Sequence, residues 1–486
     1  MNNDISDIIG IRNRALKAVK WSALAEILSI SMQPVVTLVL ARLLTPEEFG
    51  IVAVATVAVG IAQLFQEFGM GKALIQARDY SQEYANIAFW VNSVLGIVIY
   101  SIIYVAAPSI AGFFNSTDCE PILKVLCIQI IITGFYSVHS SLMQRFMKFR
   151  KIFVVRFISS VFPGALSIVL AYRGMGVWSL VWGALFGSCG QLIFYWLLSE
   201  WRPKFSFDIQ ALQKLASFSK WIMLEAALAW SITNCDSVAL GHYLGMKEVG
   251  IYRLSSSLII FVSFCSMAPV VPVAFSWFSR LQGDREELRF TFMNLTRGLA
   301  ALSLPLGFGI ALLAKPIVTV VLGDKWLGAE IAIALLAIRF GISWVFGLSS
   351  TVFSAIGKPE LNVALLVVGT LISLPVYIIA APYGLMVFCF GRLITSMIVD
   401  LLGYMILSKA LELPKRFYLQ PLCLPLAGIM LMTLVLVGLQ WGFGISSWYM
   451  LILAVILGAL TYFVSLLVFN RDFVVNGYRY ALQIMR

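Results

Sequence analysis

Runs of about 20 mainly apolar residues recur from one end of the chain to the other, and each is long enough to cross a bilayer as a helix. Windows of that length give fourteen spans. The spans cover residues 21–43, 50–70, 85–111, 121–144, 153–172, 176–199, 219–243, 251–278, 293–322, 329–356, 361–381, 385–408, 420–440 and 446–469. The sequence therefore predicts an all-α integral membrane protein with about 14 transmembrane helices.

The composition agrees with a membrane protein, because 60% of the 486 residues are hydrophobic and only 12% are charged. That is more apolar surface than a soluble core of this size could hide. Seven cysteines are scattered without a CxxC motif, and HExxH, GxSxG and P-loop patterns are missing from the sequence. We expect no enzyme, no metal site and no cofactor.

The net charge of +11 is a topology signal, because 26 of the 35 Lys and Arg residues fall in alternate segments between the predicted spans. The segment 145–151 is one of these basic segments, whereas the opposite loops carry TPEEF at 45–49 and NSTDCE at 115–120. Cytoplasmic loops are rich in Lys and Arg, so both termini are predicted to be cytoplasmic. The same distribution excludes a nucleic-acid partner.

The chain contains an internal repeat. The stretch from Lys20 to Ile51 returns as Lys220 to Ile251, with ten of 32 positions identical. The identities are Lys20/Lys220, Trp21/Trp221, Leu24/Leu224, Leu28/Leu228, Ser31/Ser231, Leu40/Leu240, Leu44/Leu244, Glu48/Glu248, Gly50/Gly250 and Ile51/Ile251. At an offset of 210, Lys148, Gly174 and Val177 also correspond to Lys358, Gly384 and Val387. Six spans therefore repeat as six, which implies two lobes of the same orientation.

The repeat and the loops give a domain organisation in six parts. It comprises an amphipathic cytoplasmic segment at 1–20, an N-lobe at 21–199, a cytoplasmic linker at 200–218, a C-lobe at 219–408, two extra helices within 409–469 and a cytoplasmic tail at 470–486. No soluble domain is expected.

Several motifs resemble a known family. The Lys20-Trp21 pair, LARLLTPEEFGIVAVA at 40–55, EFGMGKALIQ at 67–76 and LGHYLGMKEVGIY at 240–252 resemble the polysaccharide-transporter branch of the MOP superfamily. These are the Wzx-type oligosaccharide flippases, and the similarity is to the colanic-acid and teichuronic-acid transporter group. The sequence departs from this pattern at His242, where many relatives are expected to carry arginine.

The resemblance implies a MATE-like pair of six-helix lobes around a cleft that opens alternately to either face. It implies a flippase that moves undecaprenyl-pyrophosphate-linked oligosaccharide outward across the bacterial cytoplasmic (inner) membrane for surface polysaccharide biosynthesis, including lipopolysaccharide or exopolysaccharide. Partners would be the lipid bilayer, the lipid-linked oligosaccharide, and the polysaccharide polymerase and chain-length machinery. Similarity to lipid II flippases suggests that spans 13 and 14 guide the lipid tail.

Charges within spans are functional candidates, because each costs about 2.5–3.5 kcal/mol on insertion scales. The candidates for substrate binding are Arg339, Arg392, Arg253, Asp236 and Arg42, those for ion coupling are Glu26 and Asp236, and Glu67, Glu225 and Asp400 are further charges within spans. Asp236 and Arg253 come level in a hairpin about Gly245, so a salt bridge between them is the favoured interpretation and a substrate or cation role is the alternative. Arg339 needs an anion, either an acid such as Asp236 or the pyrophosphate of a cargo.

Pro269 and Pro272 are the candidate gating residues, because proline frees carbonyl groups that can line a cavity. Two other functions are considered. One is a multidrug exporter of the same fold coupled to a proton or sodium gradient, in which intramembrane acids should dominate. The other is a membrane enzyme acting on the same lipid, for which the predicted outer loops are too short.

We predict that cysteines introduced at Glu47 or Glu48 react with a thiol probe that cannot cross the membrane, when it is added outside intact cells. Cysteines introduced at 148–151 should react only after the cells are opened, because the basic loops are cytoplasmic. The native cysteines are removed first. The opposite labelling pattern would reverse the predicted orientation.

Overall fold

The computed structural model describes residues 32–67, 70–76, 82–205, 209–267, 270–413 and 420–469. In these ranges the regular structure is helical, with no β-strand, and twelve helices are long and apolar enough to cross a membrane. The chain is an all-α membrane protein, as predicted. The segment 1–20, Glu26, Pro269 and the tail 470–486 lie outside the described residues.

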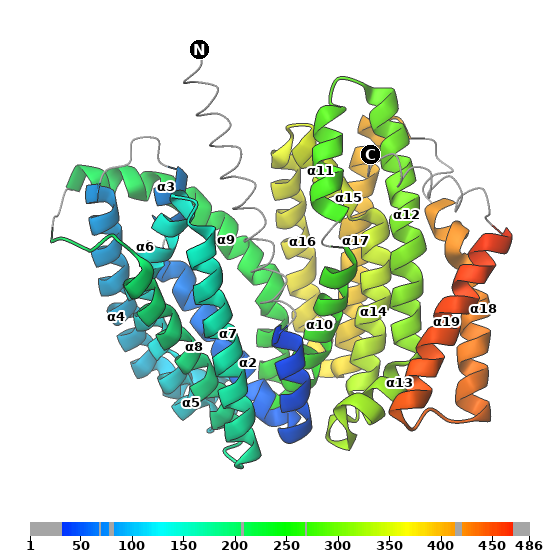
Figure 1. Cartoon of the computed structure of the whole chain (residues 1–486), viewed down its shortest axis with the longest axis horizontal. Helices are drawn as coiled ribbons and strands as arrows, with labels where there is room; N and C mark the ends of the chain where they lie inside the picture. Colours follow the sequence, from blue (N-terminus) through cyan, green and yellow to red (C-terminus); the bar gives the residue numbers. More distant parts are fainter. Residues whose placement is uncertain are drawn as a thin grey trace. The chain divides into compact units, whose positions relative to one another are not determined.

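Contacts divide the chain into two units, Met1–Gly250 and Ile251–Arg486. The first unit begins, in its described part, with the Met32–Leu43 helix. It continues with α2 (Pro46–Glu67), α3 (Met70–Gln76), α4 (Gln82–Phe113), α5 (Cys119–Leu126), α6 (Ile128–Arg145), α7 (Phe149–Tyr172), α8 (Val177–Leu198) and α9 (Ile209–Leu244), and it ends within the first turns of α10 (Figure 1).

The second unit contains the rest of α10 (Met246–Met267). It continues with α11 (Val270–Arg280), α12 (Arg285–Leu312), α13 (Ala314–Pro316), η1 (Ile317–Leu322), η2 (Asp324–Trp326), α14 (Ala329–Phe346), α15 (Leu348–Ala355), α16 (Pro359–Ala380), η3 (Ala381–Tyr383), α17 (Leu385–Ala410), α18 (Gln420–Gly442) and α19 (Trp448–Phe469). The division falls at residue 250, whereas the repeat predicts a lobe boundary in 200–218, and the lobes stay a prediction.

The described chain has twelve candidate spans where fourteen were predicted, and two predicted spans account for the difference. The first, 21–43, lies mostly outside the described residues, and its described part is the Met32–Leu43 helix. The second, 219–243, lies within α9, a helix of 36 residues that carries polar residues such as Asn234 and Asp236 and is not among the twelve.

The predicted span 293–322 is wrong at its end, because α12 covers Arg285–Leu312. The helix starts earlier since Asp284 caps it, its side chain accepting hydrogen bonds from the backbone N–H groups of Glu286 and Glu287. It stops at Leu312, and the apolar π-helical turn Ile317–Leu322 that follows prolongs the hydrophobic signal past the helix. Hydropathy alone does not separate such a turn from a continuing helix.

The internal repeat is visible in the helix bounds. α2 and α10 are both 22 residues long, they begin at Pro46 and Met246 and end at Glu67 and Met267, and each is followed by a short helix from residue 70 or 270. The broken spans Cys119–Arg145 and Ala329–Ala355 are both 27 residues long at an offset of 210. The two halves therefore share helix lengths and break points as well as sequence.

Buried polar side chains connect the helices of the first unit. Gln66 on α2 has no exposed surface, and its Nε2 donates to the carbonyl oxygens of Asn92 at 3.1 Å and Ile130 at 2.7 Å. Asn92 in turn donates to Ser137 Oγ at 3.1 Å. Small residues allow this approach, since a Cβ at Gly134 would lie 2.7 Å from Gln66 Nε2. The network therefore holds α2, α4 and α6 together within the apolar bundle.

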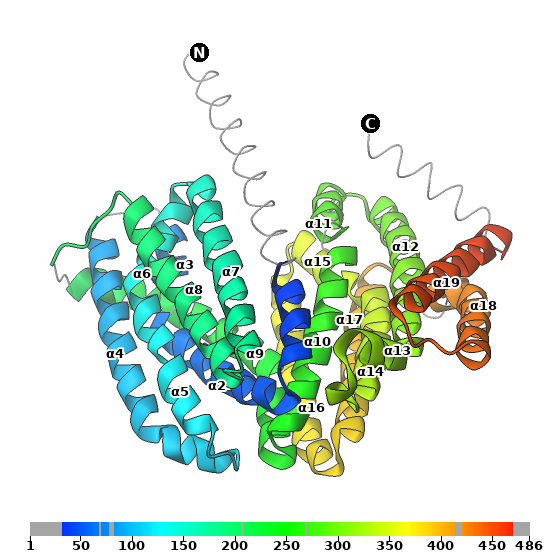
Figure 2. The same cartoon turned by 60° about the horizontal axis from the view of Figure 1, so that its bottom comes forward.

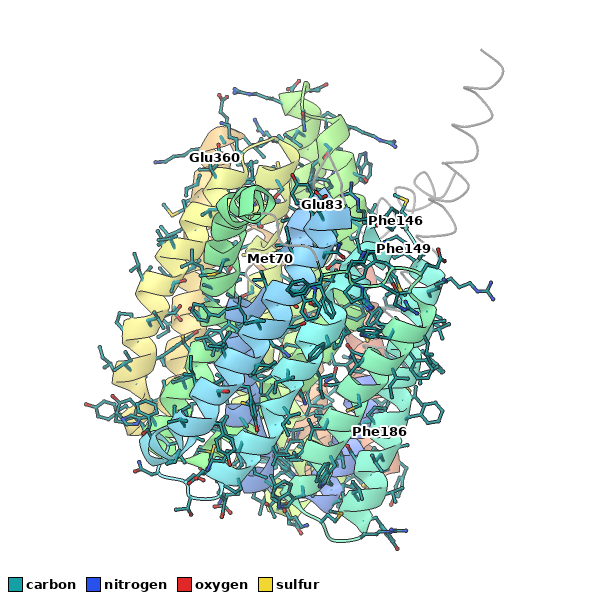
Figure 3. All side chains as sticks on the ribbon, turned by 90° about the vertical axis from the view of Figure 1, so that its left-hand side faces the viewer. Met70, Glu83, Phe146, Phe149, Phe186 and Glu360 are labelled. Atoms are coloured by element: carbon teal, nitrogen blue, oxygen red, sulfur yellow. The ribbon has the colours of Figure 1, made fainter. Side chains whose placement is uncertain are left out.

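Aromatic packing closes one end of the first unit. Met70 of α3 belongs to a buried cluster with Phe89 of α4 and Leu142 of α6. Figure 3 shows Met70, Glu83, Phe146 and Phe149 toward the same end of the bundle, with Phe186 farther along it. The start of α4 and the turn between α6 and α7 therefore lie at one end of the unit, as alternating spans require.

In the second unit, α12 and α14 pack closely through small residues. A Cβ at Gly307 would lie 2.5 Å from the carbonyl oxygen of Ala337, and Ser303 Oγ donates to the carbonyl oxygen of Gly341 at 2.8 Å. The pair α18 and α19 packs beside α12 (Figures 1 and 2). It is fixed by Tyr462, whose hydroxyl donates to the carbonyl oxygen of Ala301 at 2.7 Å.

The starts of α2 and α10 cross at the two glycines that the repeat shares, and the crossing lies within the first unit. A Cβ at Gly50 would lie 1.8 Å from the carbonyl oxygen of Met246, and one at Gly250 would lie 1.8 Å from that of Pro46. The two backbones are therefore in direct and reciprocal contact. We call this contact the glycine crossing.

We predict that Gly50→Ala or Gly250→Ala destabilises the protein by about 1–3 kcal/mol or forces the crossing apart, because neither backbone can yield without moving a helix. Thermal unfolding in detergent measures this. Gly112→Ala is the matched control, since it is also helical and has nothing within 4 Å of the added Cβ. Melting temperatures of the Gly50 and Gly250 variants equal to that of the control would contradict the crossing.

Candidate functional site

Polar side chains gather inside the second unit on four helices that span the membrane. Arg339 lies on α14, ten residues after Ala329, which is about 15 Å along the helix. The residue is half-buried, and among the described residues its buried Nε makes no hydrogen bond. A guanidinium at this depth needs an anionic partner from the chain or from a ligand.

Asp400 on α17 is the acid that the second unit provides for Arg339. Its carboxylate interacts electrostatically with the Arg339 guanidinium, and its Oδ2 accepts a hydrogen bond from Ser343 Oγ at 2.6 Å. Ser343 follows Arg339 by one turn of α14, so both residues present their polar groups to the same acid. Asp400 is therefore held in place by α14.

Aromatic rings hold the second arginine of this cluster. The Arg392 guanidinium lies 5.5 Å from the ring centroid of Tyr252 and 5.7 Å from that of Tyr377, within the range of cation–π contacts. Both rings are buried, and both pack against Phe388 at 5.6 and 5.3 Å. Arg392 thus keeps its charge within the helix bundle, beside aromatic faces. We call Arg339, Arg392, Asp400, Tyr252 and Tyr377 the arginine cluster.

The other predicted site residues are spread over the chain. Arg253 is half-buried on α10, next to Tyr252 of the cluster. Asp236 on α9 belongs to the first unit and is only 2% exposed, and its Oδ1 accepts from the backbone N–H of Ser237 at 2.6 Å. Arg42 is exposed in the Met32–Leu43 helix, and Pro272 is exposed in the first turn of α11. Tyr252 links Arg339 and Arg392, because Arg392 lies over its ring and the charge of Arg339 acts on it, and Arg253 follows Tyr252 in the chain.

Sequence reasoning did not place Asp400 near Arg339. The two residues are 61 positions apart, but α14 and α17 are both predicted to run inward from the outer end. Ser343 lies 14 residues into α14 and Asp400 lies 15 residues into α17, so they come level. This similar depth was the sequence signal that could have suggested that the two residues lie close together. The contact between the two helices could not be read from the sequence.

A cavity of about 530 Å³ lies in the first unit between the Met32–Leu43 helix, α7 and α8. Its polar lining comes mainly from one face of α7, which carries Arg156, Ser159, Ser160 and Ser167, together with Gln33 and Gln191. Arg156 is the eighth residue of α7, within the predicted span 153–172, and it lines this cavity.

The arginine cluster can bind an anion electrostatically. Arginine remains charged when desolvated and binds phosphate or carboxylate in a bidentate way. In the ranges that the structure describes, no group of three or more His, Cys, Asp or Glu side chains could hold a metal ion.

The chain is similar in sequence to a known family and to several known proteins. Residues 39–331 match the sequence profile of a family described as "Polysaccharide biosynthesis protein". The chain is 25% identical to the lipopolysaccharide biosynthesis protein WzxC of Escherichia coli (strain K12) over 432 residues, 86% of each chain. It is 24% identical to the teichuronic acid biosynthesis protein TuaB of Bacillus subtilis (strain 168) over 463 residues, 93% of this chain and 95% of the relative.

A third relative, the succinoglycan biosynthesis transport protein ExoT of Rhizobium meliloti (strain 1021), is 28% identical over 324 residues, 67% of this chain and 66% of the relative. Among solved structures, the inward closed form of the lipid II flippase MurJ is similar with a TM-score of 0.76 at 14% identity, covering 93% of this chain and 99% of that one. An inward-facing multidrug resistance MATE family transporter gives a TM-score of 0.60 at 17% identity, covering 79% and 95%. The fold is that of transporters of the MOP superfamily. The relatives include a transport protein, which agrees with the expectation that the protein is not an enzyme.

We predict that Arg339→Met destabilises the protein, because it removes the positive charge that acts on the Asp400 carboxylate within the bundle, with a coupling of about 0.5–3 kcal/mol between the two residues. Adding Asp400→Asn should recover most of the loss. Thermal unfolding of the single and double variants measures the coupling. Arg392→Met is the control, and its effect should add to that of Asp400→Asn within about 0.5 kcal/mol. If the effects of Arg339→Met and Asp400→Asn on stability are fully additive, the two residues do not interact.

Proposed function

The chain belongs to the family of polysaccharide biosynthesis proteins, with Wzx-type transporters among its relatives and a MurJ- and MATE-like fold, and on this premise we propose that it is a flippase for lipid-linked oligosaccharide. The cargo would be an undecaprenyl-pyrophosphate-linked repeat unit. It would move from the inner to the outer face of a bacterial cytoplasmic membrane, for the assembly of surface or exported polysaccharide.

The arginine cluster is the observation that supports an anionic cargo. Arg339, Arg392 and the adjacent Arg253 lie seven to ten residues from the starts of their helices, about 10–15 Å along each. Within the described spans of the second unit, Asp400 is the one acid at comparable depth. Guanidinium groups bind phosphate in a bidentate way and stay charged when desolvated, so a pyrophosphate would fit beside these arginines.

Alternating access is the mechanism that suits the repeat. The lobes would be residues 21–199 and 219–408, with both termini cytoplasmic, and the glycine crossing would be part of the barrier at the outer end. The related names support a place in polysaccharide assembly, where a polymerase and chain-length machinery would receive the flipped repeat unit. Coupling to a proton or sodium gradient stays open.

A cation-coupled multidrug exporter is the second candidate, because the fold is also similar to that of a MATE family transporter. Exporters of cationic compounds would be served by acids at membrane depth. In the described spans of the second unit, three arginines and the single acid Asp400 lie at this depth, so the flippase is the better-supported function.

We predict that proteoliposomes containing the protein move a lipid-linked oligosaccharide from one leaflet to the other, and that Arg339→Ala and Arg392→Ala each slow this at least tenfold. The loss of one charge-assisted contact of about 1.5–3 kcal/mol gives this factor. The measurement follows the access of a membrane-impermeant lectin to the sugar.

Arg173→Ala is the matched control, because Arg173 is exposed in the turn between α7 and α8 and should leave the rate unchanged. Each variant is assayed at equal protein content and after a thermal unfolding check. Dye efflux without lipid movement would favour the exporter. Lipid movement at the wild-type rate in both arginine variants would remove the cluster from the mechanism.

A further inference from the structure

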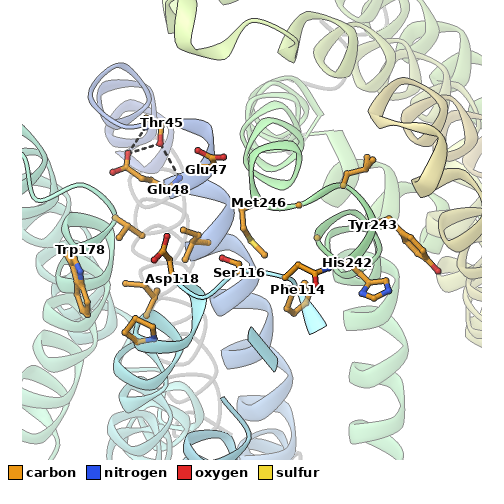
Figure 4. A pocket seen from close by; sticks show the side chains of 18 residues that line it. Thr45, Glu47, Glu48, Phe114, Ser116, Asp118, Trp178, His242, Tyr243 and Met246 are labelled. Carbon is orange, nitrogen blue, oxygen red and sulfur yellow. Dashed lines mark hydrogen bonds between the residues drawn. The ribbon is translucent and has the colours of Figure 1, made fainter. Parts of the chain in front are cut away.

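A second cavity, of about 610 Å³, lies in the first unit beside the glycine crossing (Figure 4). Its lining comes from the start of α2, the turn between α4 and α5, the start of α8 and the turn between α9 and α10. These segments lie at the end of the unit that the topology predicts to be outside. Its volume falls within the range of about 300–1,000 Å³ that is usual for small-molecule sites.

The lining is rich in hydrogen-bond acceptors. It contains the carboxylates of Glu47, Glu48 and Asp118 and the hydroxyl groups of Thr45 and Ser116, and no lysine or arginine is among the described lining residues. Phosphate or another anion would therefore be repelled. A ligand that offers many hydroxyl groups would meet an acceptor on several sides, since carboxylates form short, strong hydrogen bonds with O–H donors.

One carboxylate is fixed in position before any ligand arrives. The backbone N–H of Thr45 donates to Glu48 Oε2 at 2.7 Å, and the Thr45 hydroxyl donates to the same atom at 3.0 Å, as in a capping box at the start of α2. The other oxygen, Oε1, faces Gly176, where an added Cβ would lie only 2.4 Å away. Gly176 has a φ of +53° and supports the turn into α8.

Aromatic rings stand beside these acceptors. Trp178, in the first turn of α8, lines the cavity near Asp118 and Glu48 (Figure 4). On the other side His242 is stacked on Phe113 at 4.3 Å, and its Nδ1 lies 2.8 Å from the carbonyl oxygen of Phe113. A sugar ring has one face of C–H groups and an edge of hydroxyl groups, so an indole face next to carboxylates matches both.

We propose that this cavity is a saccharide-binding site that holds neutral, hydroxyl-rich sugar units of the cargo at the outer end of the protein. The proposal rests on the proposed function and adds the part of the cargo that the arginine cluster does not address. The site touches both copies of the repeated turn, through Glu48 before Gly50 and through Met246 before Gly250. Sugar bound here would therefore lie against the glycine crossing.

The test titrates the full-length protein in detergent with two probes, maltohexaose and the oligosaccharide released from the lipid-linked pool of the host cell and freed of phosphate. Saturation-transfer NMR reports binding. Trp178→Ala and Asp118→Asn should each weaken binding about tenfold, because each removes one main contact. Asp118 is exposed and makes no capping hydrogen bond, so its variant keeps the fold even if Trp178→Ala does not.

Two neighbours serve as controls. Trp182 lies one turn from Trp178 on α8 and is 45% exposed without lining the cavity, and Glu120 on α5 pairs with Lys124. Trp182→Ala and Glu120→Gln should bind both probes as the wild type does. Equal binding by all variants, or no binding of either sugar by the wild type, overturns the proposal. Calcium binding that Asp118→Asn abolishes, without sugar binding, also overturns it and indicates a cation site.

Lipid movement is measured on the same variants, so that failure of the saccharide site can be distinguished from failure of the proposed flippase function. Sugar binding that depends on Trp178 and Asp118 in a protein that moves no lipid would keep this site and remove the flippase. Normal lipid movement together with sugar binding that ignores both residues would keep the flippase and remove this site.

Discussion

Hydrocarbon provides no hydrogen-bond partners, so every polar group at membrane depth has to find its partner within the chain or in a ligand. Gln66 satisfies this constraint by bridging α4 and α6 through two carbonyl oxygens. Ser303 does the same between α12 and α14. Both contacts need glycine nearby, because the helices must approach closely for short side chains to reach across. Hydrogen bonds between helices and small residues at the helix interfaces therefore occur together.

The duplicated helices show how a common scaffold diverges. α2 and α10 keep the same length and the same glycine at the crossing, but they start differently. α2 starts with a Thr45–Glu48 capping box, whereas Gly245, with a φ of +87°, precedes α10. At an offset of 210, Arg339 corresponds to Gln129 and Asp400 to Gly190. These two charges of the arginine cluster thus occur in the second copy alone. The two copies share their helices, whereas the charged side chains differ between them.

Most of the helices could be predicted from the sequence because hydropathy and helix length are set by the same bilayer thickness. The predicted span 385–408, for example, corresponds to Leu385–Ala410 in the structure. The end of the predicted span 293–322 is wrong because the two separate there. The apolar turn Ile317–Leu322 continues the hydrophobic signal without continuing α12. The candidate site was harder, because Arg339 could be found as a charge within a span, but its proximity to Asp400 depends on the packing of α14 against α17.

The arginine cluster connects stability with transport. Each guanidinium at this depth carries a desolvation cost, and Asp400 offsets that cost for Arg339 while two tyrosine rings shield Arg392. A ligand shifts a conformational equilibrium only if it binds one conformation more tightly than the other. Under the proposed function, an anionic cargo would therefore have to meet these guanidinium groups in one state of the transporter and lose them in the other.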